Sequence, residues 1–564
     1  MYSGKIPAPS GHYAYSNRAR KVKCDERFPA CNRCVSTGRV CDGYGIWGGG
    51  GNSYAERYAK SNSPPEERSS TLSVPLVHQI SARPGVTNAR ERAYLDWFTG
   101  QTSTRLPGVF GSGFWDTLVL QASVTEPAIL HAVLALSCAH RSTSIAGLQS
   151  PSQSDAPDKQ EQFCLRQYSS AISGLKPHFM NSSKASLRVA LIACVVFTSL
   201  EFVRGHYQTA QVHLRNGLQL LGQLKVVSPA AHGNEPPGLS KDEQSVDGWL
   251  AEQFSRLMLQ ATLFGQRQLA APIGKPYRSL VQPVSFVSTS HARKCLDGII
   301  NEATTLAARY DMERAGSLRR LPSPELLEYQ AAIQISLAGW YMAYEASSSP
   351  SGLSKDIATV MGFKILHSYY LVARIMLSTC LRLDGEMAYD YHTQDFRAIL
   401  LNSWQLGEIV FNDAPGTKFA HDPSIPPIVA DMGWITPLYF TAIKCRVRAV
   451  RLEALRFLAH GDCKEGIWDA AVASQVGRQV MKIEEEGPME ESGNSPLIKV
   501  KSDSEEPQLP PDNHRVFDVE VILPEGSSIG LGIVCKRRRE DGSIETICQR
   551  RDTHSDQWSE EKVR

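Results

Sequence analysis

The 564-residue sequence lacks an uncharged apolar run long enough to cross a bilayer. Its longest charge-free stretch, residues 329–344, spans 16 positions and is interrupted by Gln330, Gln334 and Ser336. A membrane-spanning helix needs about 20 predominantly apolar residues, so we expect no membrane partner. Residues 1–16 also lack the apolar segment of a secretory signal. We therefore interpret the 13 cysteines as intracellular thiols or metal ligands rather than a disulfide framework.

The sequence also lacks net charge and recognisable catalytic motifs. The 60 Lys and Arg against 58 Asp and Glu leave +2, which predicts nothing about partners of the whole chain. No GxxxxGK[ST] phosphate loop occurs, and Gly111-Ser112-Gly113 lacks the GxSxG spacing of a nucleophile elbow. His131 and His140 are nine residues apart, unlike an HExxH pair, so we expect packed or capping histidines. The chain is not expected to be an enzyme.

Charge is present locally, although the total is small. Residues 1–50 hold eight Lys or Arg against three acids, and residues 484–506 hold eight acids against two lysines. The basic N-terminal region favours nucleic acid as a partner, although a solvated surface remains the alternative. Hydrophobic residues at 42% and charged residues at 21% are typical of a globular chain with a core.

Composition divides the chain into five parts. Residues 1–45 are basic and carry four cysteines, and residues 46–88, rich in Gly, Pro and Ser, are expected to be a flexible linker. Residues 89–483 have apolar residues at helical spacing and predict one large all-α domain. Residues 484–512 are acidic and are expected to be a second linker. Residues 513–564 form a β-like segment, so the predicted fold class is mainly α.

Individual helices are predicted from the same periodicity. Thr125-Glu126-Pro127 resembles a helix start, with Thr125 as the N-cap and proline in the first turn. Further helices are predicted over residues 187–203, 208–221, 439–458 and 467–481. The first of these is apolar nearly all round, which indicates a central core helix. The seven cysteines scattered through this zone are expected to be buried apolar residues.

The C-terminal part has strand signals. Val519, Val521 and Leu523 alternate with polar residues, and Asp541-Gly542 separates two short runs that could form a hairpin. The basic run 536–539 has two interpretations, a nuclear import signal or a hairpin edge protected by charge.

Four cysteines near the N-terminus carry the strongest chemical signal. Cys24, Cys31, Cys34 and Cys41 have the spacing C-x6-C-x2-C-x6-C. Zinc prefers four soft ligands at tetrahedral corners, and a CxxC pair supplies two thiolates from one turn. Neighbouring Lys and Arg lower the thiol pKa and favour metal over disulfide. Unligated thiols are the alternative.

This region, residues 18–44, resembles the fungal zinc binuclear cluster family, which binds DNA and in which six cysteines hold two zinc ions. The resemblance rests on the RxRKxKCD run, the CxxC pair and the closing GxxC. The family's first two cysteines would fall at Ala14 and Asn17. The resemblance therefore implies at most one zinc, with His12 as an additional candidate ligand, and two if both cysteines are restored. The sharp edge before Arg18 predicts either a wrong first exon or a genuine loss.

The basic run before the cysteines is the candidate DNA contact. Arg18, Arg20, Lys21 and Lys23 lie within six residues, enough for several phosphate contacts and one or two base contacts. The resemblance implies that Arg20 and Lys21 read guanine edges of a CGG-type half-site, and that Arg18 and Lys23 hold phosphates. A nuclear import signal is the compatible alternative.

The large middle zone resembles the fungal-specific transcription factor regulatory domain. The resemblance is carried by an ordered set of short motifs: Tyr94-Leu95-Asp96-Trp97-Phe98, Glu126-Pro127-Ala128, Leu200-Glu201-Phe202 and His213-Leu214-Arg215-Asn216-Gly217-Leu218. It implies a helical regulatory scaffold without catalytic residues.

Together these features predict a nuclear, zinc-dependent regulator that binds double-stranded DNA and acts with the transcription machinery. Control of a biosynthetic gene cluster follows from the family's habits alone. The alternative is a regulatory or partner protein that does not bind DNA and keeps a vestigial cluster. A homodimer is a further candidate assembly, although residues 42–88 show no heptads.

Overall fold

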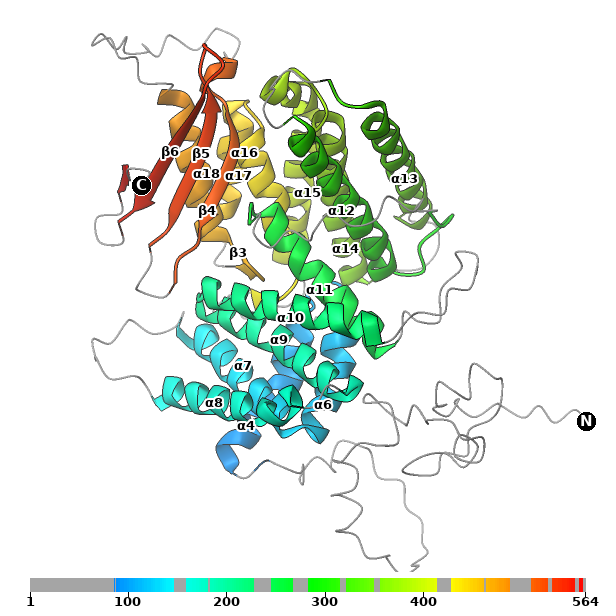
Figure 1. Ribbon diagram of the computed structural model, residues 1–564, viewed down its shortest axis with the longest axis vertical. Coiled ribbons are helices and arrows are strands. Elements are labelled where there is room, and N and C mark those ends of the chain that lie inside the picture. Colours follow the sequence, from blue (N-terminus) through cyan, green and yellow to red (C-terminus); the bar gives the residue numbers. More distant parts are fainter. Residues whose placement is uncertain are drawn as a thin grey trace, which may run out of the picture.

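The computed structural model describes most of the chain from residue 86 onward. The described residues are 86, 88–146, 159–180, 183–227, 245–266, 282–314, 321–348, 356–412, 428–460, 463–486, 509–525, 530–552 and 557–560. Within these ranges helices predominate, and the longer strands form one sheet near the C-terminal end (Figure 1). The mainly α prediction is confirmed.

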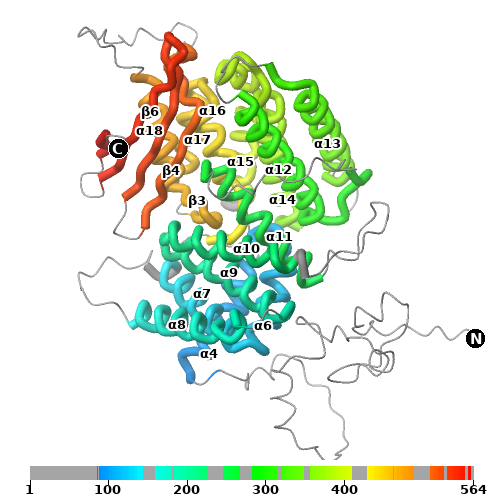
Figure 2. Tube along the Cα trace, viewed as in Figure 1, coloured from blue at the N-terminus to red at the C-terminus, as the bar shows by residue number. Residues whose placement is uncertain are grey.

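Helices from the first part of the chain form one end of the molecule, coloured blue to cyan in Figure 2. They are α4 (Ala89–Trp97), α5 (Ser103–Arg105), α6 (Val119–Thr125), α7 (Pro127–Ala146), α8 (Lys159–Phe179), α9 (Lys184–Arg204) and α10 (Tyr207–Val227). Helix α9 is the central one, since α7, α8 and α10 all pack against it. The predicted helices at 187–203 and 208–221 correspond to α9 and α10.

The limits of α9 follow from its terminal residues. The Ser183 side chain accepts a hydrogen bond from the Ser186 backbone N–H at the first turn, and Gly205 ends the helix with φ +77. Glycine adopts this left-handed conformation without the steric cost that other residues meet.

Helices α9 and α14 are long and apolar enough to cross a membrane, but 94% and 61% of their most apolar windows are buried. Such burial is typical of core helices.

The predicted N-cap role of Thr125 is wrong. Thr125 is the last residue of α6, and its hydroxyl donates back to the Gln121 and Ala122 carbonyls. Glu126 adopts an extended conformation between the two helices, and α7 begins at Pro127 as expected. A proline in the first turn is compatible with either arrangement, because it lacks only an N–H that would have no partner.

A second helical group covers the middle of the chain and is drawn in green in Figure 2. It comprises α11 (Val246–Leu263), α12 (Thr289–Glu313), α13 (Pro324–Ser348), α14 (Ile357–Thr379), a 3₁₀ turn (Gly385–His392) and α15 (Thr393–Asn412). Helix α14 packs against α12, α13 and α15, whereas α13 packs only against α12 and α14 among the larger contacts of the described elements.

The third group consists of α16 (Ile435–Lys444), α17 (Arg448–His460) and α18 (Ala470–Glu486). The sequence predicted one helix over residues 439–458, and this is wrong, because the chain breaks between α16 and α17. Cys445 takes an extended conformation with ψ 136 at the break. The prediction failed because apolar residues continue across the break, so the periodicity does not register it.

The C-terminal sheet lies against α18 (Figure 1). Its antiparallel order is β4 (Val516–Ile522), β5 (Gly532–Arg538), β6 (Ile544–Arg551) and β7 (Trp558–Glu560), after a 3₁₀ turn at Asp512–His514. Strands β5 and β6 form the predicted hairpin, with Arg538 paired to Ile544 and Gly542 at φ +84 in the turn. Three two-residue strands, β1 (Ile428–Val429), β2 (Lys464–Glu465) and β3 (Trp468–Asp469), form a smaller sheet.

Apolar side chains from all three helical groups and the large sheet join in one continuous core. Trp468 illustrates the junction: its ring centroid lies 4.3 Å from that of Phe264, which directly follows α11, and 5.1 Å from that of Tyr439 in α16, both edge-on. Edge-to-face aromatic pairs are favourable beyond their buried area. These aromatic contacts therefore join the second helical group to the third.

Candidate functional site

The residues predicted to bind zinc and DNA lie outside the described part of the chain. They are the thiolates Cys24, Cys31, Cys34 and Cys41 and the basic side chains Arg18, Arg20, Lys21 and Lys23. Four cysteine thiolates form a donor set that fits one tetrahedral zinc ion, because structural zinc sites use four such ligands. Among the described residues, no group of three or more His, Cys, Asp or Glu side chains is arranged to hold a metal.

The described interior contains charged side chains that the sequence did not indicate. Asp431 lies between Arg256 and Arg293, with a distance of 3.1 Å from Arg256 Nη1 to its Oδ2 and a bidentate pair with Arg293. Burial alone would lower the pKa of Arg293, but Asp431 and Asp297 outweigh it and raise this pKa. The Arg293 guanidinium also lies 4.5 Å from the Phe110 ring centroid. This cluster joins α11, α12 and the segment before α16.

Glu465 in β2 caps the start of α16. Its carboxylate accepts hydrogen bonds from the backbone N–H groups of Gly433 at 2.8 Å, Trp434 at 2.9 Å and Ile435 at 3.1 Å. These donors have no partner within the helix, and the positive end of the helix dipole favours a carboxylate there. Burial nevertheless raises the pKa of Glu465 to about 7. A Cβ at Gly433 would lie 2.4 Å from Glu465 Oε1, so glycine is required for this approach.

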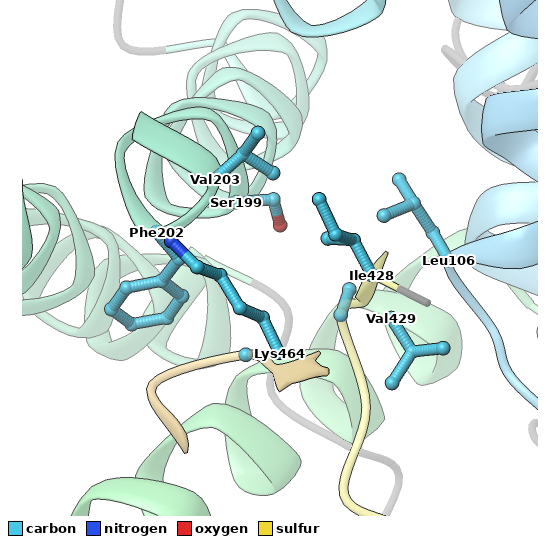
Figure 3. A pocket seen from close by; sticks show the side chains of 9 residues that line it. Leu106, Ser199, Phe202, Val203, Ile428, Val429 and Lys464 are labelled. Atoms are coloured by element: carbon cyan, nitrogen blue, oxygen red, sulfur yellow. The ribbon is translucent and has the colours of Figure 1, made fainter. Parts of the chain in front are cut away.

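Two small cavities lie beside these charged clusters. The first opens between α9, β1 and β2, and its lining includes Leu106, Ser199, Phe202, Val203, Ile428 and Lys464 (Figure 3). The second is bordered by Phe110, Arg293, Asp297 and Tyr369. Each cavity has a volume of about 10 Å³, which is room for about one water molecule. Neither has the volume of a small-molecule site.

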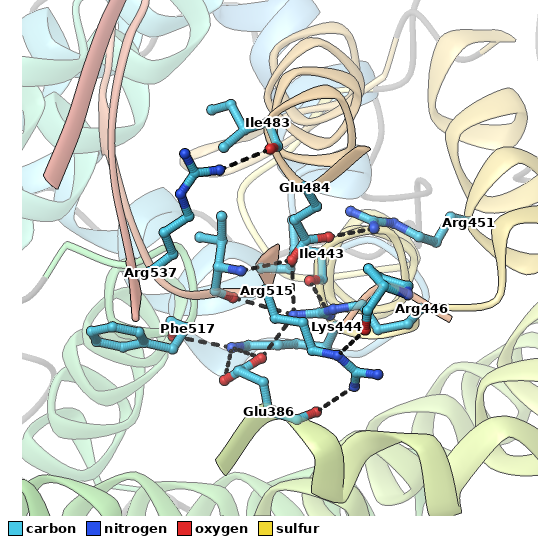
Figure 4. Close-up of polar contacts among 12 residues, drawn as sticks. Glu386, Ile443, Lys444, Arg446, Arg451, Ile483, Glu484, Arg515, Phe517 and Arg537 are labelled. Carbon is cyan, nitrogen blue, oxygen red and sulfur yellow. Dashed lines mark hydrogen bonds and ion pairs between the residues drawn. The ribbon is translucent and has the colours of Figure 1, made fainter. Parts of the chain in front are cut away.

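A third buried cluster attaches the C-terminal sheet to the helices (Figure 4). Glu484 of α18, with 1% of its side chain exposed, pairs with Arg446 at 3.0 Å and with Arg451 at 2.5 Å. The Val516 backbone N–H donates at 2.8 Å to Oε1, the same carboxylate oxygen that faces Arg446. Burial alone would raise the pKa of Glu484, but Arg446 and Arg451 outweigh it and hold this pKa below its usual value.

The same cluster continues into the 3₁₀ turn before α15. Glu386 accepts from Lys444 at 2.9 Å and from Arg446 at 2.8 Å, and Arg515 pairs with Asp390 at 2.8 Å. The Arg446 and Arg515 side chains are almost fully buried. Buried ions are tolerated where partners surround them, so this cluster fixes β4 to two helical groups.

The basic run 536–539 belongs to β5 and the turn after it. Lys536 pairs with Asp518 at 3.1 Å, Arg537 is buried and pairs with Glu545 at 2.5 Å, and Arg539 reaches Glu545 at 3.3 Å. An import signal must be presented to a receptor, whereas these side chains are engaged within the fold. The run therefore belongs to a hairpin, but the expectation of an edge strand is wrong, because β5 has β4 and β6 on its two sides.

The scattered histidines and cysteines are packed as the sequence indicated. His131 Nδ1 lies 2.6 Å from Gln167 Oε1, and His140 Nδ1 lies 2.9 Å from Thr102 Oγ1. Burial lowers the pKa of His140 to about 4. Of the seven cysteines considered, two are partly exposed, Cys295 and Cys380, and the others are buried: Cys138, Cys164, Cys194, Cys445 and Cys463.

Comparison with known proteins agrees with both resemblances. Residues 18–46 match the fungal Zn(2)-Cys(6) binuclear cluster domain, and residues 94–268 match the fungal specific transcription factor domain. Transcription regulator lscL of Purpureocillium lilacinum is 30% identical over 412 residues, covering 68% of this chain and 90% of the relative. The aspercryptin biosynthesis cluster-specific transcription regulator atnN of Emericella nidulans is 30% identical over 342 residues, covering 58% of this chain and 53% of that protein.

No solved structure matches the chain. The two domain matches occur in the order that the residues themselves indicated, and the second match, residues 94–268, covers the first part of the expected helical zone 89–483. Together with the 90% coverage of a transcription regulator, they establish what kind of protein this is. The chain belongs to the family of fungal transcription regulators that combine a Zn(2)-Cys(6) binuclear cluster domain with a fungal specific transcription factor domain.

Proposed function

We propose that the chain is a nuclear regulator that binds CGG-type half-sites in double-stranded DNA through residues 18–44. The observation that carries the proposal is the overlap of the basic run with a match to a DNA-binding domain family over residues 18–46. By position, Arg20 and Lys21 contact guanine O6 and N7, the acceptors that Lys and Arg recognise in the major groove. Arg18 and Lys23 neutralise phosphates.

One zinc ion supports this segment in our proposal. Cys24, Cys31, Cys34 and Cys41 supply four thiolates, and metal binding provides most of the folding free energy of such a small unit. The matched family is named for two zinc ions and six cysteines, whereas residues 18–46 of this chain contain four. Four thiolates satisfy one tetrahedral ion and leave no ligands for a second.

Residues 89–486, to the end of α18, act as the regulatory domain, residues 46–88 and 487–512 as connecting segments, and residues 513–564 as a sheet fixed to that domain. Support for this division comes from the helical groups and from Glu484, which binds the Val516 N–H. Because one relative is named for a biosynthetic gene cluster, we propose that the regulated genes form such a cluster. The partners are DNA, the transcription machinery and a second copy of the chain.

The missing cysteines favour one alternative, a regulator that no longer binds DNA. Titration of the full chain with a CGG-containing duplex and with a scrambled duplex, each at two salt concentrations, separates the two functions. A specific regulator binds the CGG duplex at least about tenfold more tightly at both salt concentrations, since base contacts survive screening of the phosphates. Equal, weak and strongly salt-dependent affinity for both duplexes would support the alternative.

A further inference from the structure

Helix α13 lies at the outer edge of the molecule, where one side packs on α12 and α14 (Figure 1). The opposite side faces solvent and carries no charge over residues 329–344. Between Glu328 and Glu345 its exposed residues are Ala331, Gln334, Ile335, Ala338 and Met342. Ile335 is 73% exposed and Met342 is 68% exposed. An apolar strip on a helix exposed to water indicates an interaction surface.

A neighbouring segment extends this surface. The Phe286 backbone N–H donates to Ser347 Oγ at 2.7 Å, and a Cβ at Gly339 would lie 3.3 Å from Gln282. Residues 282–287 therefore lie along the flank of α13. Val284 and Val287 of this segment are highly exposed. No charged residue occurs between positions 282 and 292 either. Two uncharged elements thus form one apolar surface.

We propose that the chain forms a homodimer in which this strip packs antiparallel on the same strip of a second copy. The α13 seam, defined as Ala331, Ile335, Ala338 and Met342, has steps of four, three and four residues. This is the spacing at which two helices interdigitate along a shared line. A two-fold symmetric contact requires a self-complementary patch, and the order of side-chain sizes along α13 supplies one.

Small and large side chains alternate along the seam, so the order from one end is the opposite of the order from the other end. With the two-fold axis between positions 336 and 337, Ile335 of one copy faces Ala338 of the other, and Met342 faces Ala331. One turn further out, Leu327 faces Ala346. Each large side chain therefore meets a small one, which allows the close packing found at protein interfaces. A parallel pair would instead oppose each large residue with itself.

The extent of the seam sets the expected strength. With the outer pair Leu327 and Ala346 included, the contact covers 19 residue steps, about 29 Å of helix. This length gives an interface smaller than the usual ~800 Å² per partner. We therefore expect a weak dimer, with a dissociation constant of roughly 1–100 µM.

In this register Glu328 faces Glu345 of the second copy at each end. Because like charges repel and salt screens them, dimerisation strengthens as ionic strength rises.

This surface specifies the self-association proposed above and does not depend on DNA binding, which the duplex titration measures separately. The test is sedimentation of the full chain without DNA over about 1–100 µM. The wild type is expected to shift from monomer to dimer across this range. Ile335→Glu is expected to raise the dissociation constant at least about tenfold, since it places a charge in the seam. Ile172→Glu, at an exposed position of α8, is the matched control and should sediment as the wild type does.

A size swap tests the register itself. Ala338→Ile alone opposes two isoleucines and is expected to weaken the dimer. Adding Ile335→Ala restores one large and one small residue in each layer, so the double variant is expected to dimerise again. Helical circular dichroism confirms that each variant is folded. A wild type that stays monomeric at 100 µM, or a dimer that Ile335→Glu leaves intact, would overturn the proposal. A double variant that stays weak would overturn the antiparallel register.

Discussion

Replacing Glu484 by glutamine tests whether the buried charge cluster stabilises the protein. Glutamine has nearly the same size, but it removes the negative charge that faces Arg446 and Arg451. The single amide oxygen of glutamine can still accept hydrogen bonds, but it cannot replace both carboxylate oxygens. Arg451 is left with a neutral acceptor at most beside the Ala442 carbonyl at 2.8 Å, whereas Arg446 keeps Glu386. Breaking a buried ion pair on one side costs about 3–5 kcal/mol. We expect the free energy of unfolding to fall by about this amount.

The adjacent residue provides a matched control. Glu485 pairs with Arg448 at 3.1 Å, but both side chains are at least half exposed. Such surface pairs contribute about 0–1 kcal/mol, so Glu485→Gln should unfold nearly as the wild type does. Urea unfolding monitored by tryptophan fluorescence compares the three proteins. Hydrogen exchange should also be faster across Val516–Ile522 in Glu484→Gln, because the Val516 N–H then has at most a neutral amide oxygen in place of the carboxylate. Equal urea midpoints for both variants would refute the reasoning.

Three further predictions concern pH, metal and DNA. Because the pKa of Glu465 is raised to about 7, above its unfolded value of about 4.3, stability is fully present below the unfolded pKa and is lost as pH rises through 7. Urea midpoints between pH 5.5 and 8 should therefore fall in the wild type and change less in Glu465→Gln. Native mass spectrometry of the full chain should find one zinc; the double variant Ala14→Cys/Asn17→Cys should bind two, and a wild type with two would contradict the four-ligand site. Lys21→Ala should cost about 1–3 kcal/mol and relax base preference, whereas Lys23→Ala should weaken all duplexes alike and reduce the salt slope by about one; identical losses would mean a purely electrostatic patch.

The long helices could be predicted because their signals are local. Helix α9 is apolar along its whole length and ends at a glycine, so its predicted limits of 187–203 lie close to the observed Lys184–Arg204. The zinc and DNA residues were identified for the same reason, since the four cysteines and the basic run fall within 24 positions. Local spacing fixes which side chains can reach one ion.

The buried charges could not be predicted, because their partners are distant in sequence. Arg256 and Asp431 are separated by 175 positions, and Glu386 and Arg446 by 60. No spacing rule links such pairs, and each residue alone resembles an ordinary surface charge. The sequence carried one weak signal of buried charge: Arg446, just before α17, and Arg451, within α17, occur in an apolar helical pattern. Cations at positions that periodicity assigns to the core require buried anions as partners.

The C-terminal sheet connects back to the region that defines the family. Beyond β4, the Glu525 carboxylate accepts from the Gln208 backbone N–H and the Thr209 hydroxyl, each at 2.7 Å, at the start of α10. Gln266 donates to the Val521 carbonyl at 2.7 Å. The three donor residues lie within the matched residues 94–268, whereas their acceptors lie more than 250 positions later. The first turn of α10 therefore obtains its cap from the end of the chain. Because apolar side chains of the sheet also belong to the continuous core, we expect a change in the sheet to alter the stability of the residues that match the family domain.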